Sequence, residues 1–188
     1  RSDRSLISPL ELDIVIPERK IAIECNGLFW HCDLYKDKKY HINKTNAVAD
    51  KGYSLIHISE YDWEFKREII ENIITVRLGK VDKKISAREC KIVELSAKDA
   101  RHFLNCNHLQ GDSKQAKIRY GLETNGELVS VMTFSHPRFS KKYDSELCRF
   151  ANKIGTSIRG SFGKLFSHYK RNNEFKKMVS YCDLAFFD

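Results

Sequence analysis

Two short apolar segments, each carrying a carboxylate, dominate the first part of the chain. Residues 12–16 and 21–25 are apolar except for Asp13 and Glu24, and Pro-Glu-Arg-Lys separates the two runs. Runs of this length around a proline-containing polar tetrad are typical of a strand, a turn and a second strand. Because side chains alternate across a strand, Asp13, Glu24 and Asn26 can all point to one side. The pattern predicts a hairpin with two acids on the same face.

Two carboxylates on neighbouring apolar strands predict a bound cation. An unpaired carboxylate is costly to bury, and two like charges at close range repel each other. A hard divalent ion relieves both effects, and Mg²⁺ takes a few carboxylates and completes its shell with water and phosphate oxygens. We therefore expect Asp13 and Glu24 to bind Mg²⁺, with Mn²⁺ as a substitute, at a phosphodiester-hydrolysing site. The alternative is a pair of surface carboxylates on a half-exposed hairpin.

The periodicity of the remaining chain predicts an α+β fold in which helices cover two small sheets. Glycine and a polar run at 79–84 mark a boundary, so we expect one domain over residues 1–80 and a second over 81–188. In the first domain the predicted elements are strands at 12–16, 21–25 and 53–58 and helices at 37–51 and 62–78. In the second they are strands at 89–95, 117–123, 128–134, 146–151 and 178–182 and helices at 96–105 and 160–171.

Two local signals support the second domain's elements. Ser96 and Asp99 resemble a capping box, which opens a helix. Asn125-Gly126 lies between two apolar runs and is typical of a tight hairpin turn.

The positive charge of the chain lies entirely in its second half. Residues 1–80 hold 13 basic and 13 acidic side chains, whereas residues 81–188 hold 20 basic and 12 acidic ones, which accounts for the net charge of +8. A basic half beside a neutral half fits a nucleic-acid-binding module joined to a nuclease. The alternative is a basic surface that serves solubility alone.

Cysteine spacing and hydropathy favour a cytoplasmic protein. The six cysteines form no Cys-x-x-Cys pair, so they encode neither a zinc knuckle nor a redox motif, and reduced thiols are expected. No apolar run approaches the roughly 18 residues that span a bilayer. The chain begins and ends in irregular segments, and we expect it to be part of a longer protein.

The residues after the hairpin extend its pattern to a known superfamily. Asp13, Glu24 and Asn26, followed by Gly-Leu-Phe-Trp-His at 27–31, resemble the PD-(D/E)xK nucleases. Within that superfamily the likeness is greatest to the very short patch repair endonucleases and related phage homing endonucleases. The resemblance covers roughly residues 8–64. It implies a Mg²⁺-dependent endonuclease that acts on double-stranded DNA.

The resemblance also implies roles for individual residues. Asp13 takes the place of the central metal-binding aspartate, Glu24 that of the second acid, and the backbone carbonyl of Cys25 that of a further metal ligand. Asn26 stands among the catalytic residues where most members have lysine and the repair branch has histidine. His31 falls on the catalytic histidine of the repair branch.

Histidine chemistry suits that last role. A neutral imidazole near pH 7 can activate water or transfer a proton beside a phosphate, although His31 could also be a polar loop residue. On the following helix His41, Lys44 and Thr45 share one face. We expect this face to contact DNA phosphates or to support His31, with a solvated face as the alternative. His57, inside an apolar strand, is expected to be a structural histidine.

One loop of the second domain predicts phosphate binding. A glycine at the start of a helix exposes backbone N–H groups to anions, and Arg159, Gly160 and Lys164 lie at such a start. This loop weakly resembles the GNAT acyltransferases, although their glycine spacing is not met. We prefer contact with the DNA backbone.

Two alternatives and one open question follow from these patterns. The second domain could be an acyltransferase or another DNA-modifying enzyme. Alternatively, the chain could be a catalytically inactive DNA-binding fragment, because the homing branch draws an acid from a helix before the first strand, which we do not expect in this sequence, and because Asn26 cannot act as a cation or a base. Whether the protein nicks one strand or cuts both as a homodimer is left open.

Overall fold

The computed structural model describes residues 3–27, 40–183 and 185–186, and it has the α+β architecture expected from the sequence. Its contacts divide the chain into two units, residues 1–70 with the chain from Cys182 onward, and residues 71–181. No helix in the described part of the chain is long and apolar enough to cross a membrane.

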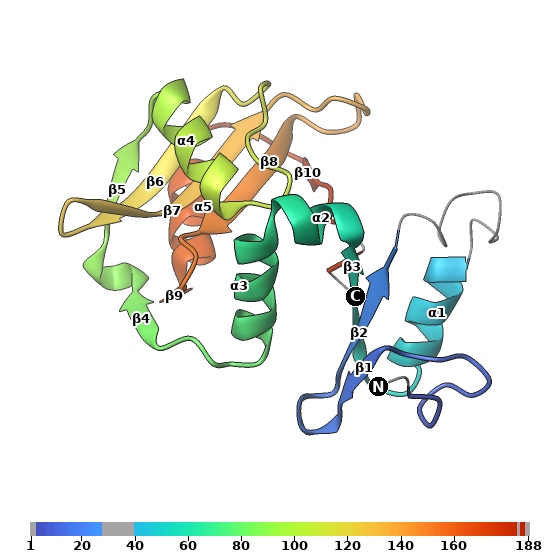
Figure 1. The fold of residues 1–188 in the computed structure, drawn as a ribbon. Helices are drawn as coiled ribbons and strands as arrows, with labels where there is room; N and C mark the ends of the chain where they lie inside the picture. Colours follow the sequence, from blue (N-terminus) through green and yellow to red (C-terminus); the bar gives the residue numbers. More distant parts are fainter. Residues whose placement is uncertain (1–2, 28–39, 184, 187–188) are drawn as a thin grey trace. The chain divides into compact units, whose positions relative to one another are not determined.

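The first unit is built on a three-stranded sheet with the order β1-β2-β3 (Figure 1). Strands β1 (Ile14–Ile16) and β2 (Ile21–Asn26) form the expected antiparallel hairpin around the 3-10 turn η1 (Pro17–Arg19). Strand β3 (Ser54–Ser59) pairs with β2 in parallel, and helix α1 (Tyr40–Ala49) makes the crossover between them. This crossover places the carboxyl ends of β2 and β3 side by side.

The predicted single helix at 62–78 is two helices. Ser59 caps the first, α2 (Glu60–Phe65), by accepting a hydrogen bond from the Asp62 N–H at 3.0 Å. Helix α2 ends at Phe65, because the next residue, Lys66, has a φ of −135° that is not helical, and α3 (Arg67–Arg77) follows. The apolar periodicity of the sequence continues across this break. A period of this kind indicates which side chains face the core, and it does not reveal an interruption of the helical backbone.

The contacts place the boundary between the units at residue 70, not at residue 80 as the glycine signal predicted. Asn72 in α3 accepts a hydrogen bond from the Gly155 N–H at 2.7 Å, which ties most of this helix to the second unit. At the other end of the chain, the Ala185 carbonyl accepts from the His57 N–H at 2.9 Å. The first unit is therefore completed by residues that the sequence assigned to the second.

The second unit contains a five-stranded sheet with the order β10-β8-β7-β6-β5. Neighbouring strands are antiparallel except β10 and β8, which are parallel. Its strands are β5 (Lys91–Glu94), β6 (Ile118–Thr124), β7 (Glu127–Ser135), β8 (Ser145–Asn152) and β10 (Met178–Ser180). A separate parallel pair joins β4 (Lys83–Ser86) to β9 (Thr156–Arg159).

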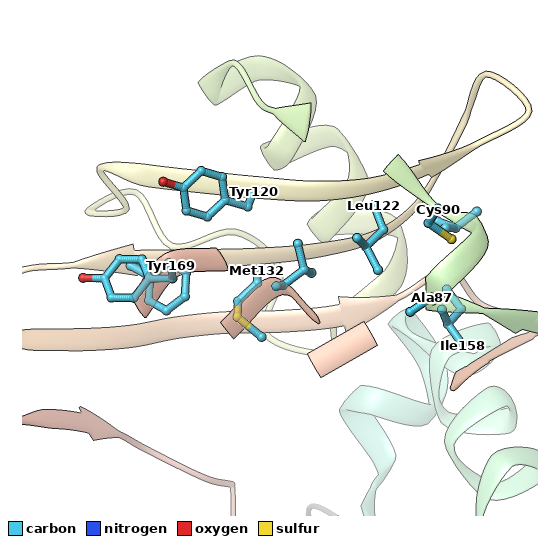
Figure 2. Packing of buried hydrophobic residues seen from close by; sticks show 10 residues of the cluster. Ala87, Cys90, Tyr120, Leu122, Met132, Ile158 and Tyr169 are labelled. Atoms are coloured by element: carbon cyan, nitrogen blue, oxygen red, sulfur yellow. The ribbon is translucent and has the colours of Figure 1, made fainter. Parts of the chain in front are cut away.

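Helices α4 (Ala97–Asn107) and α5 (Ser161–Asn172) cover opposite faces of this sheet (Figure 1). The α4 face buries a small cluster around Leu104 and Val131. The α5 face holds a larger core, in which residues of β6, β7 and α5 meet the 3-10 turn η2 (Ala87–Glu89), as Figure 2 shows. Helix α4 opens with the expected cap, because the Ser96 hydroxyl accepts from the Asp99 N–H at 3.1 Å.

Candidate functional site

The packing of α1 against the first sheet changes from apolar to polar along its length. Ala22 of β2, Leu55 of β3 and Val48 of α1 are buried in one apolar cluster. Two residues further along β2 is Glu24, which pairs in register with His57 of β3. One turn before Val48 on α1 is Lys44. The same face that holds the core at one end therefore presents ionisable groups at the carboxyl ends of two parallel strands.

Glu24 and Lys44 form a buried ion pair at the centre of this polar end. The Lys44 Nζ lies 2.5 Å from Glu24 Oε1, and their side chains are 3% and 10% exposed. Two charges at such burial are tolerated only when paired at close range, because desolvation of either one alone costs several kcal/mol. Lys44 was expected to contact DNA or to support the site. Its burial leaves the ammonium paired with Glu24 and out of reach of a DNA phosphate in this arrangement, and support for His31 stays a prediction because His31 lies outside the described residues.

His57 organises the second half of the site through a chain of hydrogen bonds. Its Nδ1 lies 3.3 Å from Asn26 Nδ2, and its Nε2 lies 2.9 Å from Thr45 Oγ1. An amide nitrogen can only donate, so Nδ1 accepts and the proton is on Nε2. The Thr45 hydroxyl in turn donates to the His41 carbonyl at 2.9 Å.

These hydrogen bonds define the environment of His41, Thr45 and His57. The His41 ring meets His57 edge-on, with centroids 5.4 Å apart. His57 is 8% exposed and fills the structural role expected of it. His41 and Thr45 lie on the side of α1 that faces β3, where both contact His57; their predicted contact with DNA phosphate or support for His31 stays a prediction.

Asp13 reaches the site from the beginning of the hairpin. It directly precedes β1 instead of lying within it, and its Oδ2 accepts a hydrogen bond from the Cys25 N–H at 2.7 Å. A side chain thus takes the place of a backbone carbonyl at the point where the β1–β2 ladder ends. The β1–β2 ladder ends at the Ile14–Ile23 pair, and Asp13 stands one residue beyond it, hydrogen-bonded to the backbone next to Glu24.

The donor set at this edge fits a hard cation. Glu24 Oε2 and Asn26 Oδ1 are buried and have no hydrogen-bond partner among the described residues. A buried oxygen without a partner costs about 1–3 kcal/mol, and a divalent ion beside it removes that cost. Three oxygen-bearing side chains, those of Asp13, Glu24 and Asn26, are typical ligands of Mg²⁺. Among the described residues there is no group of three or more histidine, cysteine, aspartate or glutamate side chains that could hold a metal ion, so a Mg²⁺ site here would depend on Asn26 and on water as further ligands.

The Cys25 thiol interacts electrostatically with both carboxylates. Cys25 is an exposed residue. The pKa of its thiol is raised, firstly by partial desolvation and secondly by the negative charges of Asp13 and Glu24. Its predicted role as a metal ligand concerns its backbone carbonyl and stays a prediction. His31, the predicted catalytic histidine, lies outside the described residues.

The Cys25 thiol provides a direct test of this electrostatic arrangement. Asp13→Asn removes one negative charge, so the thiol pKa falls, more thiolate is present at pH 8, and alkylation by iodoacetamide becomes several-fold faster. Mg²⁺ bound between the carboxylates would act in the same direction. The measurement is the alkylation rate of the Cys25 peptide by mass spectrometry, with exposed Cys106 as the internal control. An unchanged Cys25 rate in Asp13→Asn would place the carboxylate away from the thiol.

The predicted phosphate loop of the second unit is only partly available. Gly160 has a φ of +81° and stands at the N-cap of α5, and Arg159 before it is exposed. The Lys164 ammonium, however, donates to the carbonyls of Ala87 at 2.8 Å and Cys90 at 2.5 Å. Lys164 therefore fastens turn η2 to α5, and the prediction that it binds phosphate is corrected. Phosphate contact by Arg159 and Gly160 stays a prediction, as does the acyltransferase alternative.

Sequence reasoning missed the partner of Glu24, although a signal for it was present. Lys44 precedes the buried Val48 by four residues, so both lie on the core-facing side of α1. A lysine on such a face needs a buried anion, and Glu24 was the candidate. Comparison of the chain with models of known families, with curated proteins and with solved structures found no match.

Proposed function

We propose that the first unit is the core of a metal-dependent endonuclease that hydrolyses phosphodiester bonds of double-stranded DNA. The observation that carries this proposal is the buried oxygen edge. Asp13 accepts from the Cys25 N–H, Glu24 Oε2 and Asn26 Oδ1 have no partner among the described residues, and the buried Lys44 adjoins Glu24. Oxygen ligands beside a positive charge suit a negatively charged phosphodiester better than a neutral substrate.

Each residue has a role that follows from its position. Asp13 and Glu24 would hold Mg²⁺ or Mn²⁺, with Asn26 Oδ1 as a further oxygen ligand. The ion, when bound, would polarise the phosphate and stabilise the charge that develops on it. Lys44 fixes the Glu24 carboxylate and contributes positive charge to the site. Asn26 is oriented by His57, which keeps its carbonyl oxygen directed away from the imidazole.

His31 keeps the proton-transfer role that the sequence predicts for it. An imidazole at this position would take a proton from the attacking water or give one to the leaving oxygen. Cutting of both strands would require two copies of the site, and a homodimer would provide them.

Plasmid cleavage tests the proposal. In Mg²⁺ or Mn²⁺ the unaltered protein is expected to nick or linearise supercoiled DNA, and Asp13→Asn or Glu24→Gln to lower the rate about a hundredfold or more, because a misplaced metal ruins the reacting geometry. Glu18→Gln is the matched control, since Glu18 is an exposed carboxylate on turn η1 of the same hairpin.

Binding must be measured alongside cleavage. Gel shifts should show that Asp13→Asn still binds DNA, which separates loss of chemistry from loss of substrate. Equal cleavage by Asp13→Asn and the unaltered protein would refute the assignment. Binding without cleavage in either metal would instead identify an inactive DNA-binding module.

A further inference from the structure

The second unit exposes a pair of aromatic rings at one end of its sheet. Phe139 in the β7–β8 loop is 76% exposed and is the most exposed large apolar side chain in the part of the chain that the structure describes. Tyr181, directly after β10, is 50% exposed. Their ring centroids are 5.7 Å apart at an interplanar angle of 86°. A ligand that covers such a ring removes apolar surface from water, which is favourable.

Phe139 is held in position from the interior of the sheet. Glu146 of β8 is fully buried and accepts two hydrogen bonds from Arg138, from its backbone N–H at 3.0 Å and its Nε at 2.8 Å, and its Oε1 forms an ion pair with the Arg138 Nη2 at 2.7 Å. The guanidinium of Arg138 lies over the Phe139 ring, 5.2 Å from its centroid. A buried anion therefore orients a cation, which packs against the exposed ring. Such an ordered ring loses little rotamer freedom when it binds.

Two chain segments combine to form this surface. The Asp144 carboxylate accepts from the N–H groups of Lys176 at 2.9 Å and Lys177 at 3.0 Å, and the Asp144 N–H donates to the Lys177 carbonyl at 2.8 Å. The β7–β8 loop is thereby joined to the segment before β10. We call residues 136–144 and 174–181 together the basic aromatic surface.

The charge of this surface is strongly positive. It carries five basic residues and two acidic ones, namely Arg138, Lys141, Lys142, Lys176 and Lys177 against Asp144 and Glu174. All four lysines are exposed. With both carboxylates counted against the five basic side chains, the surface keeps a net charge of +3.

The first unit also exposes a pair of aromatic rings, but among acidic side chains, so comparing the two pairs separates the effect of charge from that of the rings. Helix α2 also exposes two rings, Tyr61 at 57% and Phe65 at 61%, with centroids 4.8 Å apart. Its remaining residues include Glu60, Asp62 and Glu64. The carboxylates around the α2 rings repel a polyanion, whereas the lysines around Phe139 and Tyr181 attract one.

We propose that the basic aromatic surface binds single-stranded DNA. An unpaired base stacks on Phe139 beside Tyr181, and the neighbouring phosphates contact the exposed lysines. This combination of stacking ring and cationic track is how proteins bind single strands without reading sequence. Duplex DNA keeps its bases stacked on each other and cannot use the ring in this way. The proposal uses none of the residues of the nuclease site and does not rest on that function.

Fluorescence anisotropy with a labelled oligothymidylate tests it, in EDTA so that no cleavage intervenes. Phe139→Ala is expected to weaken binding about 5- to 150-fold, the range found for loss of one stacked base, while Phe139→Tyr retains binding. Lys141→Gln with Lys142→Gln should reduce the slope of log affinity against log salt concentration by about 1.4. Phe65→Ala on acidic α2 is the matched control and should bind like the unaltered protein.

Several outcomes would overturn the proposal. Binding by Phe139→Ala within twofold of the unaltered protein would remove the ring from the interface. An equal loss in Phe65→Ala would show that the effect is not specific to the basic aromatic surface, and an equal loss on a blunt duplex of the same length would exclude base stacking. Because Phe139 is exposed, its variants should keep the circular dichroism and melting curve of the unaltered protein. Failure of the nuclease assay would leave this measurement unaffected.

Discussion

Lys44→Met is expected to lower the free energy of unfolding of the first unit by about 3–5 kcal/mol. The substitution keeps the length of the side chain but removes the ammonium that lies 2.5 Å from Glu24 Oε1. Glu24 then remains as a buried charge with its other oxygen also lacking a protein partner among the described residues. Truncating one member of such a pair is more costly than the pair's net contribution, because the surviving charge is left uncompensated.

A double-mutant cycle separates these effects. Glu24→Met alone should also destabilise the unit, whereas Lys44→Met with Glu24→Met should recover most of the loss, because two apolar side chains of similar size replace both charges. Both tryptophans of the chain lie in the first 70 residues, so tryptophan fluorescence during urea unfolding follows this unit. Additive losses in the double variant would contradict the ion pair.

Phe134→Ala is expected to lower the free energy of unfolding of the second unit by about 3–5 kcal/mol. Phe134 in β7 is fully buried at the centre of the α5-side core. Its ring stacks on that of Tyr169 in α5, with centroids 3.6 Å apart and planes 14° apart. Removing the ring leaves a cavity that a strand fixed between two neighbours cannot close.

Hydrogen exchange measured on peptides from β6, β7 and β8 reports this loss directly. Phe162→Ala is the matched control, because Phe162 lies on α5 in the same unit but is 44% exposed; its loss should be less than half as large. Equal protection of the β7 peptides in Phe134→Ala and the unaltered protein would show that the ring does not support the sheet.

Elements encoded by neighbouring residues could be predicted from the sequence. The Asn125-Gly126 turn has φ values of +51° and +76° and joins β6 to β7 as expected. The cap at Ser96 opens α4, and the first hairpin pairs Ile14 with Ile23. Each depends on contacts within a few residues, where turn chemistry and side-chain alternation are decisive.

Pairings between distant segments could not be predicted. Strands β4 and β9 pair in parallel although about 70 residues separate them, Lys83 lying opposite Thr156. The return of Ala185 to His57 is a similar case. Neither segment has a strong local pattern of its own, and only the assembled unit decides its partner.

The candidate site divides in the same way. The sequence by itself determined that Glu24 and Asn26 alternate onto one side of β2, because that follows from the two-residue period of a strand, whereas the expectation that Asp13 joins them stays a prediction. Only the tertiary structure decided that Lys44 lies against Glu24, that His57 orients Asn26, and that Lys164 serves η2 instead of a ligand. Side-chain partners across elements depend on how a helix is seated on a sheet, and that seating is set by the whole buried face and not by any one segment.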